Sequence, residues 1–218
     1  MIPNFSHYIE VNKIKMKDLI IVGAGGFGRE AYHLAKSIGK WNIKGFIDDN
    51  IDALNGIIID SKIIGAISEW KPNDNQVFAM GISSPIAKEK VAKLLKERGA
   101  EFVTLISPKT VVNETATIGE GSVITSGSSV GDNAVLGNFV HIACSMIGQD
   151  SVIGDFSTTT GFVNTVTSKV GRRVFVGSHS VLLADVADDA FICAGSIVFT
   201  KVKAGTKVMG NPAKKVVF

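Results

Sequence analysis

A glycine-rich turn near the start of the chain has the composition of a phosphate-binding loop. Residues 23–28 read GAGGFG, so that Gly23, Gly25 and Gly28 satisfy the pattern GxGxxG. The apolar run 19–22 before the turn predicts a buried strand, and the apolar spacing from Glu30 onward predicts a helix that ends at Gly39. Backbone N–H groups at a helix N-terminus attract anions, and missing side chains let a phosphate approach. The turn therefore indicates a phosphate-bearing ligand.

The elements after this turn favour half of a dinucleotide site. A second predicted strand, 43–47, ends in Asp48 and Asp49, where an acidic side chain is placed to hold a sugar hydroxyl. Before the repeats begin we expect only one more strand and helix, over 77–81 and 85–98, and a last strand over 102–105. A full dinucleotide fold needs two mononucleotide-binding halves. We therefore expect one nucleotide with its attached group; a turn that merely closes a helix onto a sheet is the alternative, because GxGxxG alone is a weak signal.

The second half of the chain repeats every six residues. Aliphatic residues recur at that spacing, and several are followed by glycine: Ile118, Ile124, Val130, Leu136 and Ile142. This period matches neither a helix nor an alternating strand. Three short faces joined by tight turns would place every sixth side chain inside a parallel β-helix. One step, from Leu182 to Ile192, is ten residues instead of twelve, which predicts one short coil.

The chain divides at Ser107 and Pro108. We expect residues 1–15 to be an extension outside the fold, residues 16–107 to form a Rossmann-like α/β half domain, and residues 108–218 to form the β-helix with a basic C-terminal tail. A β-helix has flat outer faces and no concave pocket of its own. A site must form where two prisms meet or where another domain leans over a face, so we expect a homo-oligomer, and a trimer for three-sided prisms.

Composition excludes several classes of function. The chain has 218 residues, 45% hydrophobic and 20% charged, with a net charge of +3. Its basic residues are scattered, without the dense basic stripe typical of nucleic-acid binding, and no apolar run approaches the ~18 residues that span a membrane. Residues 1–15 do not resemble a secretory signal. We expect Cys144 and Cys193 to be buried, unpaired thiols, and the protein to be cytoplasmic.

The order of the motifs resembles a known family. GAGGFGRE, FIDDN and AMGISSP precede the six-residue repeats, and AGSIV and GNPAK follow. From Met16 to the C-terminus this arrangement is similar to the bacterial sialic acid O-acetyltransferase and UDP-amino-sugar N-acetyltransferase family. The resemblance implies a left-handed β-helix, an exception to the usual right-handed crossover. It also implies a trimer that binds acetyl-coenzyme A in the groove between prisms, under a nucleotide sugar held by the small domain.

The resemblance assigns binding roles to particular residues. The loop, the acidic pair after the second strand and the later strand end would bind the nucleotide sugar: Gly23, Ala24, Gly25, Gly26, Phe27, Gly28, Asp48, Asp49, Gly81 and Ile82. The AGSIV and GNPAK motifs would run beside coenzyme A through Ala194, Gly195, Ser196 and Lys214. For Lys201, Lys214 and Lys215 the alternative is ordinary solvated surface charge.

The chain departs from the family pattern at the catalytic position. Active members carry histidine followed by an acidic residue after a coil glycine, and the histidine accepts the proton of the attacking group. Here the sequence reads GQDSVIG from Gly148, so Gln149 replaces the base while Asp150 keeps the acidic position. A carboxamide can position a nucleophile by hydrogen bonding, but it does not accept a proton usefully near neutral pH.

Three explanations of this change stay open. An amine nucleophile is partly unprotonated near neutrality and can attack without a strong base, and losing a general base costs on the order of 10²–10⁴-fold in rate. Another histidine, His141 or His179, can serve as the base, unless both are structural or merely exposed. The third explanation is a catalytically degenerate sugar-nucleotide-binding or scaffold protein.

The remaining histidines and a metal are not expected to take part. His7 lies in the N-terminal extension and His33 on the first predicted helix. Zinc-binding β-helix trimers of the γ-carbonic anhydrase class use three histidines, whereas the repeats here contain two. The sequence thus predicts a metal-free transferase that moves acetyl from acetyl-coenzyme A to an amino or hydroxyl group of a nucleotide-linked sugar, for surface glycan synthesis.

Overall fold

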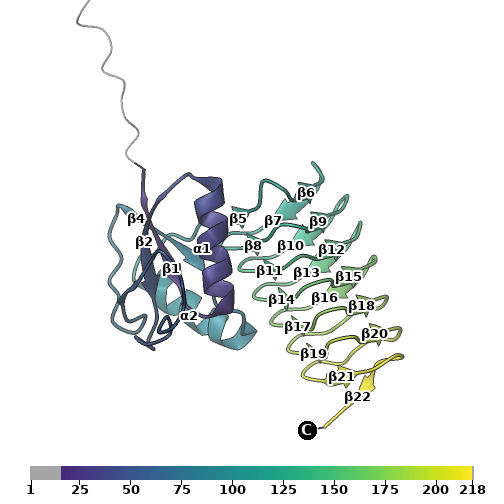
Figure 1. The fold of residues 1–218 in the computed structure, drawn as a ribbon. Helices are drawn as coiled ribbons and strands as arrows, with labels where there is room; N and C mark the ends of the chain where they lie inside the picture. The colour runs from purple at the N-terminus through teal and green to yellow at the C-terminus, as the bar shows by residue number, and fades with distance from the viewer. Residues whose placement is uncertain (1–15, 218) are drawn as a thin grey trace, which may run out of the picture.

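The computed structural model describes residues 16–217 and consists of two parts (Figure 1). A small α/β domain leans against one face of a tall prism of stacked coils, and the chain ends at the far end of the prism from the first coils. Among the described residues, no helix is long and apolar enough to cross a membrane.

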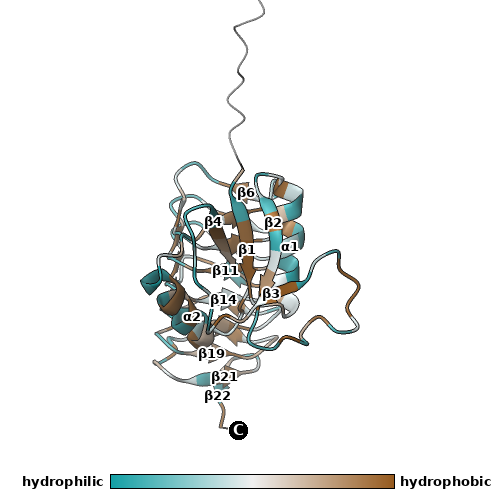
Figure 2. Cartoon of the chain, turned by 90° about the vertical axis from the view of Figure 1, so that its left-hand side faces the viewer, coloured by the Kyte–Doolittle hydropathy of each residue, from teal (hydrophilic) through white to brown (hydrophobic). Residues whose placement is uncertain are grey.

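The small domain is a four-stranded parallel sheet with one helix on each face. Its elements are β1 (Asp18–Val22), α1 (Gly26–Ile38), β2 (Asn42–Ile47), β3 (Ile63–Gly65), β4 (Gln76–Met80) and α2 (Pro85–Glu97). The strand order is β3-β2-β1-β4. Because successive strand residues point to opposite faces, Leu19 and Ile21 pack on the α1 side and Ile20 and Val22 on the α2 side. Figure 2 shows the hydrophobic β1 beside the equally hydrophobic edge strand β4.

The predicted elements of this domain are confirmed except for the last strand, and β3 is an additional strand that the sequence did not predict. Helix α1 begins at the glycine turn and ends at Gly39, which adopts φ 70° as a left-handed cap. The predicted strand 102–105 is wrong. Phe102 makes a single bridge to Phe78 of β4, and Leu105 belongs to β5, which pairs with β8 of the prism. Apolar residues pack equally well in the core of the small domain and in the core of the prism. Their pattern in the sequence therefore does not show where the chain passes from the first core to the second.

The prism has three parallel sheets, which we call faces 1, 2 and 3. Face 1 contains β5 (Leu105–Ile106), β8 (Val123–Ile124), β11 (His141–Ile142), β14 (Thr158–Thr159), β17 (Phe175–Val176), β19 (Phe191–Ile192), β21 (Lys207–Met209) and the antiparallel β22 (Lys214–Lys215). Face 2 contains β6 (Val111–Val112), β9 (Ser129–Val130), β12 (Met146–Ile147), β15 (Asn164–Thr165), β18 (Val181–Leu182) and β20 (Ile197–Val198). Face 3 contains β7 (Thr117–Ile118), β10 (Val135–Leu136), β13 (Val152–Ile153) and β16 (Lys169–Val170).

The six-residue period places one aliphatic side chain per face in the prism core. Ile124, Val130, Leu136 and Ile142 are each at most 2% exposed, and Ile118 packs against the same core from the first coils. These inward positions confirm the parallel β-helix predicted from the repeats. The short coil is also confirmed, because Val186 bridges Val170 and Val202 as a single residue on face 3.

The two cysteines lie at prism corners and not in the core. Both are free and half-buried, which corrects the prediction that they are buried. Cys144 has φ 40°, and Gly127 and Gly195 occupy the same type of corner with φ 77° and φ 71°. At Cys144 this left-handed backbone carries the side chain away from the core.

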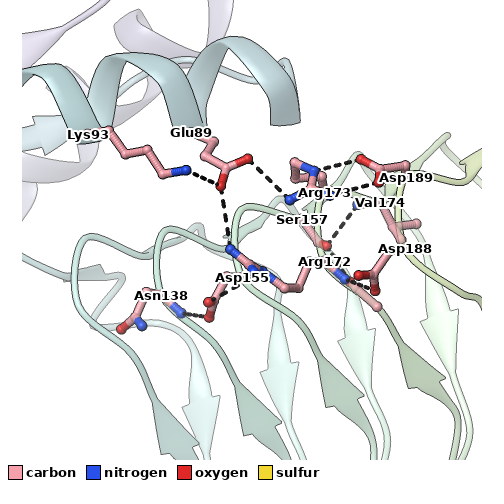
Figure 3. A network of polar contacts seen from close by, with 11 residues as sticks. Glu89, Lys93, Asn138, Asp155, Ser157, Arg172, Arg173, Val174, Asp188 and Asp189 are labelled. Atoms are coloured by element: carbon pink, nitrogen blue, oxygen red, sulfur yellow. Dashed lines mark hydrogen bonds and ion pairs between the residues drawn. The ribbon is translucent and has the colours of Figure 1, made fainter. Parts of the chain in front are cut away.

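Aromatic and charged contacts dock α2 on the corner between faces 3 and 1. Phe102 packs edge-on against Phe139 at 5.0 Å between ring centroids, and Phe139 stacks on Phe156 at 5.3 Å. Glu89 of α2 accepts from Arg173 at 3.2 Å, and Arg173 also pairs with Asp189 at 2.6 Å (Figure 3). These contacts therefore fix the position of the small domain along face 1 of the prism.

Candidate functional site

The glycine turn forms an open N-terminus on α1. Helix α1 starts at Gly26 without a side-chain cap and without an acidic residue in its first turn, so its backbone N–H groups can bind an anion. A side chain at Gly28 would collide with the carbonyl group of Gly23, which has φ 91°. The backbone conformation of the turn therefore requires glycine at both positions.

The acidic pair after β2 shapes the loops around this turn. Asp48 accepts hydrogen bonds from the backbone N–H groups of Ala24 at 2.7 Å and Asn50 at 2.9 Å. Asp49 accepts from the backbone N–H of Ser68 at 2.8 Å. Asp48 is thus adjacent to the glycine turn, whereas Asp49 stabilises the loop that follows β3.

The segment after β4 packs directly on the glycine turn. A Cβ atom on Gly81 would lie 2.5 Å from Cα of Gly28 and 2.9 Å from the carbonyl oxygen of Val22. Likewise, a Cβ atom on Gly23 would lie 2.9 Å from Cγ1 of Ile82. The structure therefore brings together the two chain segments for which the sequence predicted contact with a nucleotide sugar.

A pocket of about 310 Å³ opens beside this segment, between the first turn of α2 and face 1. Its wall includes Ser83 and Ser84 on one side and the stacked rings of Phe175 and Phe191, 4.8 Å apart, on the other. Its volume lies near the lower limit for small-molecule sites, which suits a single ring more than a complete nucleotide sugar.

His141 is enclosed between the glycine turn and face 1. The ring of Phe27 stands at 88° to its imidazole, 4.3 Å between centroids, and the side chain is only 2% exposed. Burial lowers its pKa well below 6.5, and the positive charge of Lys88 lowers the pKa further. Nε2 makes no hydrogen bond, and it lies 3.9 Å from Oε2 of Glu30. This environment disfavours the protonated form that a general base must reach.

Lys88 is a buried residue that the sequence reasoning missed. Its side chain is 1% exposed, and Nζ donates to the Oγ1 of Thr158 at 2.8 Å and to the carbonyl oxygen of Ser157 at 3.1 Å. Burial lowers the pKa of Lys88 to about 7. Its spacing from Ala92 and Leu95, both buried on α2, is the sequence signal that places it on the buried helix face.

Gln149 and Asp150 lie on the corner between β12 and β13, where faces 2 and 3 meet. Both are exposed, and Asp150 has φ 55° with its backbone N–H donating to the carbonyl of Asp132 at 2.9 Å. The glycine turn covers face 1 instead. Within one chain, the predicted catalytic pair and the predicted sugar site are therefore on different sides of the prism.

The residues predicted to bind coenzyme A are close to one another. Ala194 and Gly195 lie on the corner between faces 1 and 2, and the loop before Lys214 contacts the same coil. His179 lies on this corner and stacks on Phe162 at 4.9 Å, and the N–H of Gly195 in the next coil donates to the carbonyl of Ser178 at 2.8 Å. The 210–214 loop is tied to the same coil, because Ile197 donates to the carbonyl of Gly210 at 3.0 Å and accepts from Ala213 at 2.8 Å. Lys214 follows in β22 and is exposed.

Residues 18–95 match the family model of the PglD N-terminal domain. The match covers β1 to β4 and most of α2, which together make up the small domain. A curated relative, UDP-N-acetylbacillosamine N-acetyltransferase of Bacillus subtilis, is 28% identical over 113 residues, 50% of this chain and 51% of the relative. The chain thus matches about half the length of that curated relative. Both matches confirm the resemblance to bacterial sugar acyltransferases.

Solved structures extend the likeness to nearly the whole chain. The acetyltransferase domain of PglB from Neisseria gonorrhoeae, also solved with acetyl coenzyme A, has a TM-score of 0.85 at 22% identity in its free form, covering 92% of this chain and 100% of that one. WeeI from Acinetobacter baumannii has a TM-score of 0.76 at 26% identity, covering 91% and 99%. PerB from Caulobacter crescentus, in complex with CoA and GDP-perosamine, has a TM-score of 0.83 at 17% identity, covering 92% and 97%. These likenesses confirm the predicted fold, an α/β half domain followed by a left-handed β-helix.

Proposed function

We propose that this protein transfers an acetyl group from acetyl-coenzyme A to an amino group of a nucleotide-linked sugar, in surface glycan synthesis in the cytoplasm. The observation that carries the proposal is the packing of Gly81 and Ile82 on the open glycine turn, directly above face 1 of the β-helix. The named activity of the Bacillus subtilis relative and the acetyl coenzyme A complex of PglB support it.

In the proposed reaction the sugar amine attacks the thioester carbonyl directly. A C–N bond forms, the C–S bond breaks, coenzyme A leaves as its thiol, and the amine loses one proton. The carboxamide oxygen of Gln149 would accept a hydrogen bond from the amine and orient it, and Asp150 would support this contact. An amine needs less help from a base than a hydroxyl group, which is why Gln149 favours amino over hydroxyl acceptors.

If a side chain accepts the proton, His179 suits that role better than His141. His141 is enclosed under Phe27, whereas His179 lies on an outer corner beside Ala194 and Gly195. His179 and Gln149 occupy the two corners that border face 2. They would meet only across a contact between two prisms, so this role depends on the proposed trimer.

We propose that face 2 and its corners form the contact of a homotrimer. Large apolar side chains are exposed there, including Val111 at 71%, Met146 at 53%, Phe162 at 63%, Leu183 at 45% and Phe199 at 55%. Several large apolar side chains exposed on one side of a protein are typical of a protein–protein contact. In a closed ring of three prisms, the corner with His179 of one subunit would face the corner with Gln149 of the next, leaving a groove for coenzyme A.

Ligand-dependent melting and thiol release test this function. Acetyl-coenzyme A and UDP- or dTDP-linked amino sugars should each raise the melting temperature, because a ligand that binds the native state stabilises it. Mixing both should release a free thiol. Binding without any thiol release across the panel would favour the degenerate scaffold, and the absence of both binding signals would rule out the enzyme and the sugar-binding protein alike.

A further inference from the structure

We infer that Lys88 is a positioning residue for the sugar site, acting through Thr158 on the segment Gly81–Ser84. This inference rests on the proposed function, because it concerns the site for the nucleotide sugar. Its basis is a chain of three buried or half-buried groups that joins α2, face 1 and the loop after β4.

The first contacts of this chain are made by the ammonium group. Lys88 Nζ donates to Thr158 Oγ1 at 2.8 Å and to the carbonyl oxygen of Ser157 at 3.1 Å. Lys88 is 1% exposed and Thr158 is fully buried. A lysine in such a position loses the hydration of its charge, which costs free energy. This cost points to a role for Lys88 that an apolar side chain would not perform.

The next contact reaches the loop itself. Thr158 Oγ1, which accepts from Lys88, donates its own hydrogen to the carbonyl oxygen of Ser83 at 2.8 Å. The hydroxyl group therefore uses both its functions: it accepts a hydrogen bond from Lys88 and donates one to Ser83. Without the lysine the hydroxyl would be free to rotate, and its bond to Ser83 would no longer be fixed.

The contacts beyond Ser83 are made by close packing. Gly81, two residues earlier, lies so close to Gly28 that a Cβ atom would come within 2.5 Å of its Cα, and Ile82 fills the space next to Gly23. A shift of Ser83 would therefore displace the glycine turn or open a gap beside it. Ser83 is also part of the wall of the 310 Å³ pocket, opposite Phe175 and Phe191. The position of β14 in the prism thus sets the geometry of the sugar site in the small domain.

Two substitutions at Thr158 separate this role from a general loss of stability. T158V removes the hydroxyl group at nearly constant shape, and T158S retains it. We expect T158V to raise the KM for the nucleotide sugar roughly tenfold, with the KM for acetyl-coenzyme A unchanged, because small displacements of positioning groups are costly. T158S should restore most of the affinity.

Lys88 itself is tested by K88M, with K90M on the exposed side of the same helix as a matched control. K88M should raise the same KM roughly tenfold while the protein stays folded, and K90M should not. Hydrogen exchange without ligand gives a second measurement. The amides of residues 81–84 should exchange faster in T158V and K88M than in T158S and K90M.

The outcomes distinguish this inference from the proposed function. If the unmodified protein binds nucleotide sugars but T158V and K88M bind them equally well, Lys88 has no positioning role and the function stands. If the two variants lose melting temperature without any change in the KM, the contact is only structural. If the unmodified protein binds no nucleotide sugar, both proposals are overturned.

Discussion

The ring of Phe27 packs edge-on against the imidazole of His141, with the two ring centroids 4.3 Å apart. Phe27 belongs to the glycine turn and His141 to face 1, so this contact joins the predicted phosphate site to the prism. It also closes the space through which a substrate would reach His141. A histidine that was a candidate base in the sequence is thereby part of the domain contact.

Replacing His141 by leucine tests this assignment. We expect H141L to keep kcat within about threefold of the unmodified protein, whereas loss of a general base costs on the order of 10²–10⁴-fold. The variant should also melt at a higher temperature, because it removes a buried nitrogen that makes no hydrogen bond. A fall in kcat by two orders of magnitude with unchanged melting would show that His141 is the base. H179A, measured beside it, reports on the other candidate.

Lys88 and His141 predict how stability depends on pH. Burial lowers the pKa of Lys88 from 10.5 to about 7, and it lowers the pKa of His141 well below 6.5. Over the window between 10.5 and about 7 for Lys88, and below 6.5 for His141, the unfolded chain binds more protons than the native chain. The free energy of unfolding therefore decreases as the pH falls through these windows.

Urea denaturation of the unmodified protein and K88M at about pH 7, 8 and 9 checks the contribution of Lys88. A shift of one pKa unit corresponds to about 1.4 kcal/mol, so the lysine should contribute a slope of that order per pH unit. K88M should show a flatter dependence and a higher midpoint at pH 7. Parallel curves for the two proteins would mean that Lys88 is not desolvated in solution.

Gln149 provides the most direct test of catalysis. Changing it to histidine should raise kcat by roughly 10²-fold if the base position is intact and merely vacant. The kcat of Q149H should fall as the pH drops below the ordinary pKa of histidine, because a side chain at position 149 is exposed. Q149N, which keeps a carboxamide, is the matched control and should show no such fall. Equal rates for Q149H and the unmodified protein would indicate that the reaction does not occur at this corner.

The apolar side chains around face 2 predict the oligomeric state. M146E would bury a charge in the proposed contact, so we expect sedimentation velocity to show monomers in place of trimers. I86E is the control, because Ile86 is 70% exposed and lies on α2, away from face 2. A trimer that survives M146E but not I86E would place the contact on the side of the small domain.

The sequence by itself determined the architecture of the prism. Where the period of six residues holds, inward positions such as Ile124, Val130 and Leu136 could be assigned without knowing their neighbours. The ten-residue step from Leu182 to Ile192 showed that one coil is short, but not which residue in it points inward. The glycine turn was equally readable, because Gly23 and Gly28 meet a steric requirement that acts within six residues of chain. Lys88 left a local signal as well, since it shares the buried face of α2 with Ala92 and Leu95.

Only the tertiary structure decided what lies between the two parts. Lys88 and His141 belong to elements more than fifty residues apart in the sequence, and both are buried because the small domain docks on face 1. The same docking divides residues 102–105 between two sheets and places Gln149 on a side of the prism that the glycine turn does not cover. The local sequence of His141 carries no sign of the burial that changes its pKa and accessibility, because the element that covers it is distant in the sequence. A histidine in a repeat therefore looks the same in the sequence whether it is a base or is packed under another domain.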